Sequence, residues 1–160
     1  MTPGDQKREE IRRVDRELQV WRQGDCALGD HWFVHRFAPG SPLTPEAVMV
    51  VEDPETAGID LAEAAVLGLM IASQTCDLVR TCVERPFVEV CPLVEVSEEQ
   101  LREIERGRRP QYAFVPGVAE RQLVADLDRV MTLEKPLVAG WERTPGCRED
   151  AERRRLALAL

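Results

Sequence analysis

The chain has 160 residues, of which 44% are hydrophobic and 31% are charged, and its formal net charge at pH 7 is −8. This length fits a single domain over residues 1–160 with a continuous hydrophobic core. The acidic balance disfavours RNA and other polyanions as partners. No apolar run reaches the roughly 20 residues of a membrane span. The charged first twenty residues lack a signal-peptide core, so we expect a cytoplasmic protein without membrane contact.

The first predicted element is an amphipathic helix that ends before Gly24. Its apolar residues lie three or four positions apart, the spacing of one helix face. They are Ile11, Val14, Leu18 and Trp21. The apolar residues of the following segment, 24–37, predict one or two short strands with a turn at Gly29–Asp30.

The middle of the chain predicts a loop followed by two strands. Residues 38–46 hold three prolines and one glycine, which is typical of a loop. Residues 47–51 predict a short strand, and residues 52–58 an acidic turn. The apolar run at 64–72 fits a helix or a strand by pattern. We interpret its second half as a central strand, because polar residues follow it and residues 85–96 supply another apolar run.

The second half of the chain predicts strands between two helices. Pro92 within the apolar run at 85–96 indicates an edge strand or a bulge. Ser97 and Gln100 form a capping box for a helix that ends at Gly107. Residues 111–117 and 121–133 predict the last strands. The tail at 149–160 predicts a helix, although its alternating leucines would also fit a strand. We expect these leucines to dock on the body or on a partner, unless the sequence ends before the natural domain does.

Four segments, taken in order, resemble the MazF/PemK toxin family of small SH3-like barrels. Residues 21–28 (WRQGDCAL) resemble the opening strand of the family, and residues 66–74 (VLGLMIASQ) resemble its central strand. Residues 88–96 (VEVCPLVEV) resemble the next strand. Residues 123–138 (LVADLDRVMTLEKPLV) resemble the late segment that leads into a closing helix. The resemblance implies an α+β fold, a twisted SH3-like β-barrel over about 21–138 with N-terminal, middle and C-terminal helices, and a bacterial toxin–antitoxin or defence context.

The resemblance does not extend to the ribonuclease residues of the family. Toxins of this family cut RNA with an arginine just before the central strand and a threonine or serine after the following strand. Arginine neutralises the charge of the phosphorane, and the hydroxyl helps to bind or to move protons. Here LAEAA precedes the central strand without an arginine, and Val94 stands where the hydroxyl residue is expected. We therefore expect an accessory or conflict-system protein that binds a partner or ligand, with RNA cleavage lost.

The segment SQTCDLV, residues 73–79, is the main candidate site. It follows the apolar run at 64–72, so we expect it at a barrel rim, where loops and pockets gather. The candidate ligand- or partner-binding residues are Ser73, Gln74, Thr75, Cys76 and Asp77. Two interpretations remain open: a pocket with polar residues that recognise a ligand, or a hydrogen-bonded turn. In the turn, Asp77 accepts backbone amides and Gln74 remains available to a ligand.

Two enzymatic alternatives use the same segment. The first is a divergent endoribonuclease or other nucleic-acid-cutting enzyme with a rebuilt site. Its candidate catalytic residues are His31, Gln74, Cys76, Asp77 and Arg85. The second is a cysteine-dependent enzyme or thiol sensor, which needs a neighbouring histidine or arginine to lower the thiol pKa. Buried structural thiols are commoner than reactive ones, which weakens this alternative.

The five cysteines predict free thiols and neither a metal nor a cofactor. Successive cysteines at 76, 82 and 91 are too far apart for the short C-x₂₋₄-C pairs of structural zinc sites. A zinc site assembled across strands is the alternative. Its ligands would be Cys26, Cys76, Cys82 and a histidine.

A basic and aromatic segment follows the middle helix at residues 106–114 (RGRRPQYAF). Its arginines and its two aromatic residues, Tyr112 and Phe114, suit a nucleic acid strand held by charge and stacking. A solvated helix end is the competing interpretation, because cations are favoured at the C-terminus of a helix. The acidity of the chain favours that second interpretation. We expect a protein partner and leave open a homo-oligomer.

Overall fold

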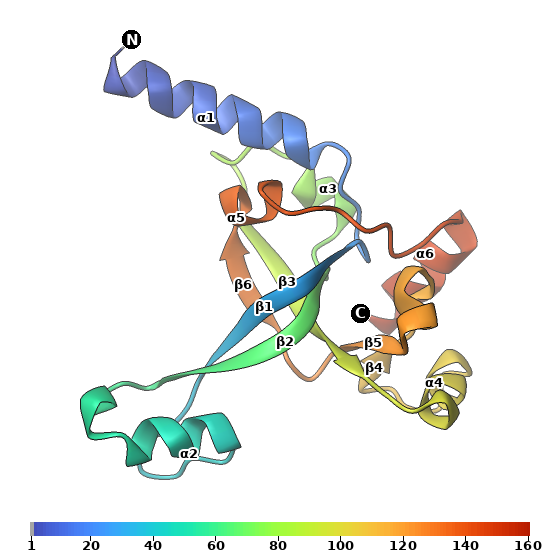
Figure 1. Ribbon diagram of the computed structural model, residues 1–160. Coiled ribbons are helices and arrows are strands. Elements are labelled where there is room, and N and C mark those ends of the chain that lie inside the picture. The colour runs from blue at the N-terminus through green and yellow to red at the C-terminus, as the bar shows by residue number, and fades with distance from the viewer. Residues whose placement is uncertain (1) are drawn as a thin grey trace.

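The computed structural model describes residues 2–160 and shows an α+β fold built on a six-stranded antiparallel sheet (Figure 1). The strands are β1 (Cys26–Arg36), β2 (Leu61–Ile71), β3 (Phe87–Glu95), β4 (Tyr112–Ala113), β5 (Leu123–Asp126) and β6 (Met131–Glu134). The helices are α1 (Pro3–Leu18), α2 (Pro45–Glu52), α3 (Thr75–Leu78), α4 (Glu98–Glu105), α5 (Lys135–Ala139) and α6 (Asp150–Ala159), with short 3₁₀ turns η1 (Pro54–Thr56) and η2 (Pro116–Arg121).

The central strand is β3, in the order β1–β2–β3–β5–β4 with β6 also paired to β3. One edge of β3 pairs with β2, and the other edge pairs with β6 as far as Val90 and with β5 from Leu93. Pro92 lies between these two partners, where a residue without a backbone N–H is tolerated. Of the two predicted alternatives, an edge strand or a bulge, the edge strand is therefore wrong.

The pairing of the described strands does not close into a barrel. β1 lies at one end of the strand order, yet it approaches β6 through a side chain. The backbone N–H of Val34 in β1 points to the Sδ atom of Met131 in β6, with a separation of 3.2 Å. The α+β class is confirmed, and the sheet is open at β1.

β1 is one continuous strand, and the predicted turn at Gly29–Asp30 is wrong. The pairing register with β2 shifts between Leu28 and His31, which marks a β-bulge. Gly29 has a φ angle of 111°, a conformation that a residue without a Cβ adopts readily. The glycine that suggests a turn in the sequence therefore bends the strand without reversing it.

Residues 47–51 form part of helix α2, so the predicted strand there is wrong. The side chain of Thr44 accepts a hydrogen bond from the backbone N–H of Ala47, at 3.2 Å. Pro45 occupies the first turn, where its missing N–H costs nothing. These two capping signals favour a helix, and the apolar run shows no alternation that would favour a strand.

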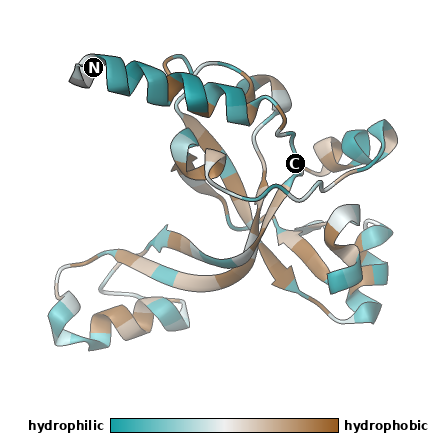
Figure 2. Ribbon diagram, turned by 45° about the horizontal axis from the view of Figure 1, so that its top comes forward, coloured by the Kyte–Doolittle hydropathy of each residue, from teal (hydrophilic) through white to brown (hydrophobic). Residues whose placement is uncertain are grey.

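Helix α2 and the far ends of β1 and β2 form an arm that projects from the rest of the molecule (Figures 1 and 2). Burial alternates along the first half of β2, with Ala62 and Ala64 buried and Leu61, Glu63 and Ala65 exposed. Trp32 of β1 pairs with Ala65 on the exposed face. Trp32 and Leu67 are 59% and 50% exposed, so this face of the arm carries uncovered apolar side chains next to Glu63.

Several other elements confirm the sequence predictions. Val14 and Leu18 of α1 are buried in the main core, as the predicted helix stripe requires, whereas Ile11 is half-buried and Trp21 is buried beyond the end of the helix at Leu18. The capping box at the start of α4 is present. The tail forms α6, and Leu156 packs against Gly24, while Leu158 is 90% exposed. Within residues 2–160, no helix is long and apolar enough to cross a membrane.

The segment between α5 and α6 returns to the start of β1. Cys26 and Thr144 exchange two backbone hydrogen bonds, of 2.8 Å and 2.7 Å. A Cβ on Gly146 would lie 1.7 Å from the carbonyl oxygen of Gly24, so the two backbones touch. Asp25 is buried, which raises its pKa, and its carboxylate accepts the N–H of Gly146 at 3.3 Å.

Candidate functional site

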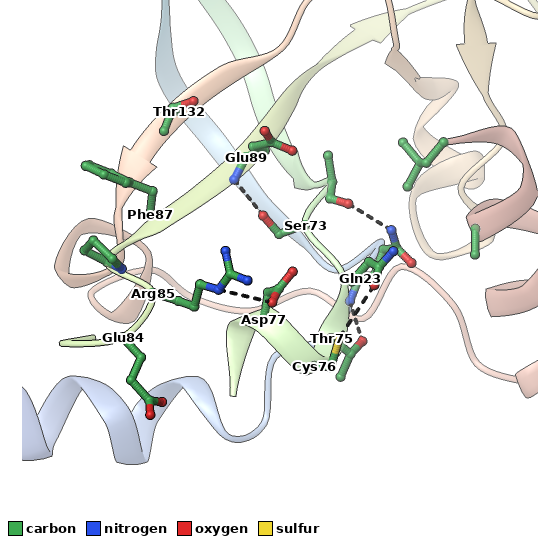
Figure 3. Close-up of a pocket in the computed structure, with 15 residues that line it drawn as sticks. Gln23, Ser73, Thr75, Cys76, Asp77, Glu84, Arg85, Phe87, Glu89 and Thr132 are labelled. Atoms are coloured by element: carbon green, nitrogen blue, oxygen red, sulfur yellow. Dashed lines mark hydrogen bonds and ion pairs between the residues drawn. The ribbon is translucent and has the colours of Figure 1, made fainter. Parts of the chain in front are cut away.

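The polar segment that follows β2 lines a pocket of about 980 Å³, which we call the β2-exit pocket (Figure 3). Residues 72–77 form one wall. The loop before β3 and the first half of β3 form another, with Arg85, Phe87 and Glu89. Gln23, Thr132 of β6, Ala157 of α6 and Leu160 after α6 also line it. The pocket therefore joins segments that are far apart in the sequence.

Two hydroxyl groups in this segment stabilise the fold. The Oγ atom of Ser73 accepts a hydrogen bond from the backbone N–H of Glu89 at 2.8 Å. The Oγ1 atom of Thr75 accepts one from the backbone N–H of Gln23 at 3.1 Å. Gln23 also donates through its side-chain amide to the carbonyl oxygen of Ala72, at 2.9 Å. The strand exit is thus a hydrogen-bonded turn held to β3 and to the segment before β1.

After this turn the chain enters the short helix α3, which is anchored by a buried lysine. Lys135 of α5 is fully buried, and its Nζ donates to the carbonyl oxygens of Asp77 and Arg80, at 2.9 Å and 2.6 Å. The last carbonyl groups of a helix lack partners within the helix, so a buried cation is well placed there. Burial lowers the pKa of Lys135.

Asp77 does not make the backbone hydrogen bonds predicted for it. Among residues 2–160, no backbone N–H donates to its carboxylate, and its Oδ1 lies 3.7 Å from the Nε of Arg85. Asp77 lies on the outer side of α3 and points toward the pocket, as Figure 3 shows. Ser73 and Thr75 bond to the backbone instead, so the predicted turn role of Asp77 is wrong.

The ionisable groups of the β2-exit pocket are mostly acidic. Three carboxylates line it, from Asp77, Glu84 and Glu89, against one guanidinium, from Arg85. The side chain of Arg85 is 55% exposed. Phe87 and Leu160 add exposed apolar surface. This arrangement suits a cationic group attached to an apolar body, because the carboxylates outnumber the cation.

The structure brings four of the five candidate catalytic residues together and leaves one apart. Gln74, Cys76, Asp77 and Arg85 all line the pocket, whereas His31 does not. The ring of His31 packs edge-on against Trp141, with 4.9 Å between ring centroids. His35 also lies elsewhere, with its Nε2 3.2 Å from the Oγ1 of Thr44. The pocket therefore contains no histidine to act as a base.

Cys76 is the exposed thiol of the candidate segment. Its Sγ lies 3.5 Å from the side-chain oxygen of Gln74. A nucleophilic thiol needs a neighbouring base or cation, and no such contact to Cys76 is present in the described part of the chain. This geometry gives the cysteine-dependent alternative no support.

The other four cysteines have the environment of structural thiols. Cys26, Cys91 and Cys147 are buried, and Cys82 is half-buried. Burial raises the pKa of Cys82, Cys91 and Cys147 to about 11. Of the residues that the structure describes, no three histidine, cysteine or acidic side chains form a group suited to a metal ion.

The sequence analysis missed nine residues that line the pocket. They are Gln23, Ala72, Glu84, Pro86, Phe87, Glu89, Thr132, Ala157 and Leu160. The alternation in β3 carries a signal for two of them, because Phe87 and Glu89 share the exposed side of a strand whose other side is buried. Thr132 lies opposite Glu89 in the pairing of β6 with β3, a register that no short motif reveals.

Comparisons with models of known protein families, with curated proteins and with solved structures found no match.

Proposed function

We propose that this chain is a bacterial accessory or conflict-system protein that binds a basic segment of a protein partner in the β2-exit pocket and does not cut RNA. One observation carries the proposal: the polar exit of the central sheet lines a pocket whose ionisable side chains are three carboxylates and one guanidinium. A partner arginine or lysine would meet Asp77 and Glu89, and the apolar part of the partner segment would rest on Phe87.

We also propose that the fold of this chain is related to the SH3-like barrel of the MazF/PemK family. It is supported by the order of the four resembling segments and by the approach of β1 to β6. Strands β1, β2, β3 and β6 all contribute to the main core, and the contact between Val34 and Met131 spans the gap that pairing leaves open. In this proposal the chain is an open variant of such a barrel.

The alternative is a divergent endoribonuclease with a rebuilt site around the Asp77–Arg85 pair. The surplus of carboxylates weakens this alternative, because an RNA phosphate would be repelled by all but Arg85. The pocket also lacks a histidine, the most common general base, since His31 lies against Trp141.

The arm favours a protein over a small molecule as the partner. An exposed tryptophan beside an exposed leucine on a bare strand face is typical of a protein interface. No lysine or arginine occurs between Arg36 and Arg80, whereas seven acidic residues do. A basic protein surface therefore matches both the arm and the pocket in charge. A second copy of this acidic chain would be repelled.

The proposal is tested by titrating the protein with a short acetylated peptide of alternating arginine and glycine. A peptide with glutamate in place of arginine is the matched control. We expect the basic peptide to bind and the double variant Asp77→Asn/Glu89→Gln to weaken it about tenfold, the effect of one charge-assisted hydrogen bond. Glu95→Gln, an exposed β3 position outside the pocket, is expected to bind like the wild type. An equal loss of peptide affinity in the double variant and in Glu95→Gln would refute the pocket assignment. A molecular mass in solution that doubles as the protein concentration rises would favour self-association.

A further inference from the structure

A second pocket, of about 790 Å³, lies between the end of α4, β4 and α6, and we call it the α4–α6 pocket. It shares no lining residue with the β2-exit pocket. Its volume lies within the roughly 300–1,000 Å³ of small-molecule sites. It contains most of the basic and aromatic segment at 106–114, for which the proposed function has no role.

The body of the α4–α6 pocket is apolar and partly aromatic. Ile104 and Leu156 are buried, and the rings of Tyr112 and Phe114 are half-buried against the small core around Ile104. Leu158 is 90% exposed and also lines the pocket. Aromatic rings that are partly accessible in a pocket can stack on a flat ligand.

Two arginines on different elements line this pocket without a carboxylate partner. Within the described residues, neither Arg106, after α4, nor Arg155, in α6, takes part in an ion pair. Their neighbours do: Arg109 contacts Glu103 at 2.6 Å and Arg153 contacts Asp150 at 2.7 Å. The two unpaired guanidinium groups therefore retain their donors for a ligand.

The pocket carboxylate nearest to Arg155 in sequence is engaged elsewhere. Glu152 accepts the backbone N–H groups of Arg148 and Glu149, at 2.7 Å and 3.2 Å, and these bonds lower its pKa. Three arginines and two glutamates line the α4–α6 pocket, in a chain whose net charge is −8. The unpaired guanidinium groups of Arg106 and Arg155, beside aromatic side chains, are the feature that selects a ligand.

We propose that the α4–α6 pocket binds a small aromatic anion. The anionic group, a carboxylate, sulfonate or phosphate, lies between Arg106 and Arg155, and the ring stacks beside Tyr112 and Phe114. Arginine donates two parallel hydrogen bonds to such groups. A long polyanion is disfavoured, because the rest of the acidic surface repels it whereas a single small anion fits inside the pocket.

The probe is anilinonaphthalene sulfonate, followed by fluorescence on the full chain, with phenylnaphthylamine as the matched neutral compound. We expect Arg106→Gln/Arg155→Gln to weaken binding of the sulfonate at least tenfold, or 1.4 kcal/mol, and to leave binding of the neutral compound unchanged. The control is Arg108→Gln/Arg154→Gln, which alters two neighbouring exposed arginines outside the pocket lining. Melting curves establish that both variants are folded.

Competition with benzoate and with phenyl phosphate then shows whether the pocket prefers a carboxylate or a phosphate ligand. Displacement of the sulfonate probe by either compound supports the site. An equal loss in the control variant would overturn the proposal, as would equal affinity for the charged and neutral compounds. A thymidine oligonucleotide that displaces the probe more effectively than phenyl phosphate would also overturn it, in favour of single-stranded nucleic acid.

Discussion

The ammonium nitrogen of Lys135 lies 2.9 Å from the carbonyl oxygen of Asp77, and this hydrogen bond joins α5 to α3 at the β2-exit pocket. The backbone of Asp77 is thus held from the interior while its side chain faces the pocket. The same nitrogen donates to the carbonyl oxygen of Arg80. A buried residue of the last third of the chain therefore positions the candidate site.

Lys135→Met is expected to destabilise the fold by about 2–3 kcal/mol, because two carbonyl groups lose a charged donor in a buried place. Chemical unfolding in urea measures this loss. Lys7→Met, at an exposed position in α1, is the matched control and is expected to leave stability unchanged. A Lys135→Met protein as stable as the control variant would show that these two bonds contribute nothing.

Ser73→Ala is expected to lower mainly the stability of the fold, and Asp77→Ala mainly the affinity for the basic peptide. Ser73→Ala removes a hydrogen bond to the backbone N–H of Glu89 and is expected to cost about 1 kcal/mol of stability. Asp77→Ala removes a partly exposed ion pair, worth less than about 1 kcal/mol, and is expected to weaken binding of the basic peptide. Melting and titration of both variants separate the two roles, and the reverse pattern would contradict this division.

We expect the pure protein to leave single-stranded RNA intact and to bind it only weakly, with an affinity that falls as salt rises. The pocket has one guanidinium and no histidine, so it offers little for phosphoryl transfer. Incubation with labelled RNA and electrophoresis checks this. Cleavage that disappears in Arg85→Ala would favour the endoribonuclease alternative.

Thiol labelling at pH 8 is expected to modify Cys76 first, because it is exposed whereas three other cysteines are buried. Burial raises the pKa of Cys91 and Cys147 to about 11, so these thiols remain protonated at that pH. Ellman's reagent follows the reaction in native and denatured protein. Cys76→Ser should remove the fast phase; a fast phase that persists would place the reactive thiol elsewhere.

Stability is expected to fall between about pH 9 and pH 11. In the unfolded chain a cysteine loses its proton near its ordinary pKa of 9.0, whereas Cys82, Cys91 and Cys147 hold theirs to about 11. The folded state binds more protons in this window, so its stability decreases as the pH rises. Lys135 acts in the opposite direction, because burial lowers its pKa.

Melting temperatures across this window test the pH prediction. Cys91→Ala is expected to make the decline shallower, since one thiol with a raised pKa is removed. Lys135→Met is expected to make it steeper, since the opposing group is removed. A flat profile in the wild type would contradict the expected linkage.

The accuracy of the sequence predictions depended on how local the deciding contacts are. The capping box at Ser97 and the helix stripe at Val14 were predicted correctly, because the residues that form them are close in the sequence. The error at 47–51 is also local: Thr44 and Pro45 are helix-start signals that outweigh a short apolar run.

The candidate site was predicted less completely, since its geometry depends on distant segments. Ser73 and Asp77 look equally able to bond a turn, and only the approach of Glu89 decides that Ser73 does so. The role of Lys135 depends on the packing of α5 against the end of α3, which no pattern within either segment contains. The polar strand exit was predictable, but its division into fold-stabilising and pocket-facing side chains was not.

The pairing of Cys26 with Thr144 sets an order of events during synthesis. The ribosome releases Cys26, at the start of β1, long before it releases Thr144. The edge of β1 at Cys26 therefore remains unpaired while β2 and β3 assemble. An unpaired strand edge is a template for association with other chains. The close passage of Gly146 over Gly24 then completes the structure late, and we expect nascent chains that stop before Thr144 to depend on chaperones.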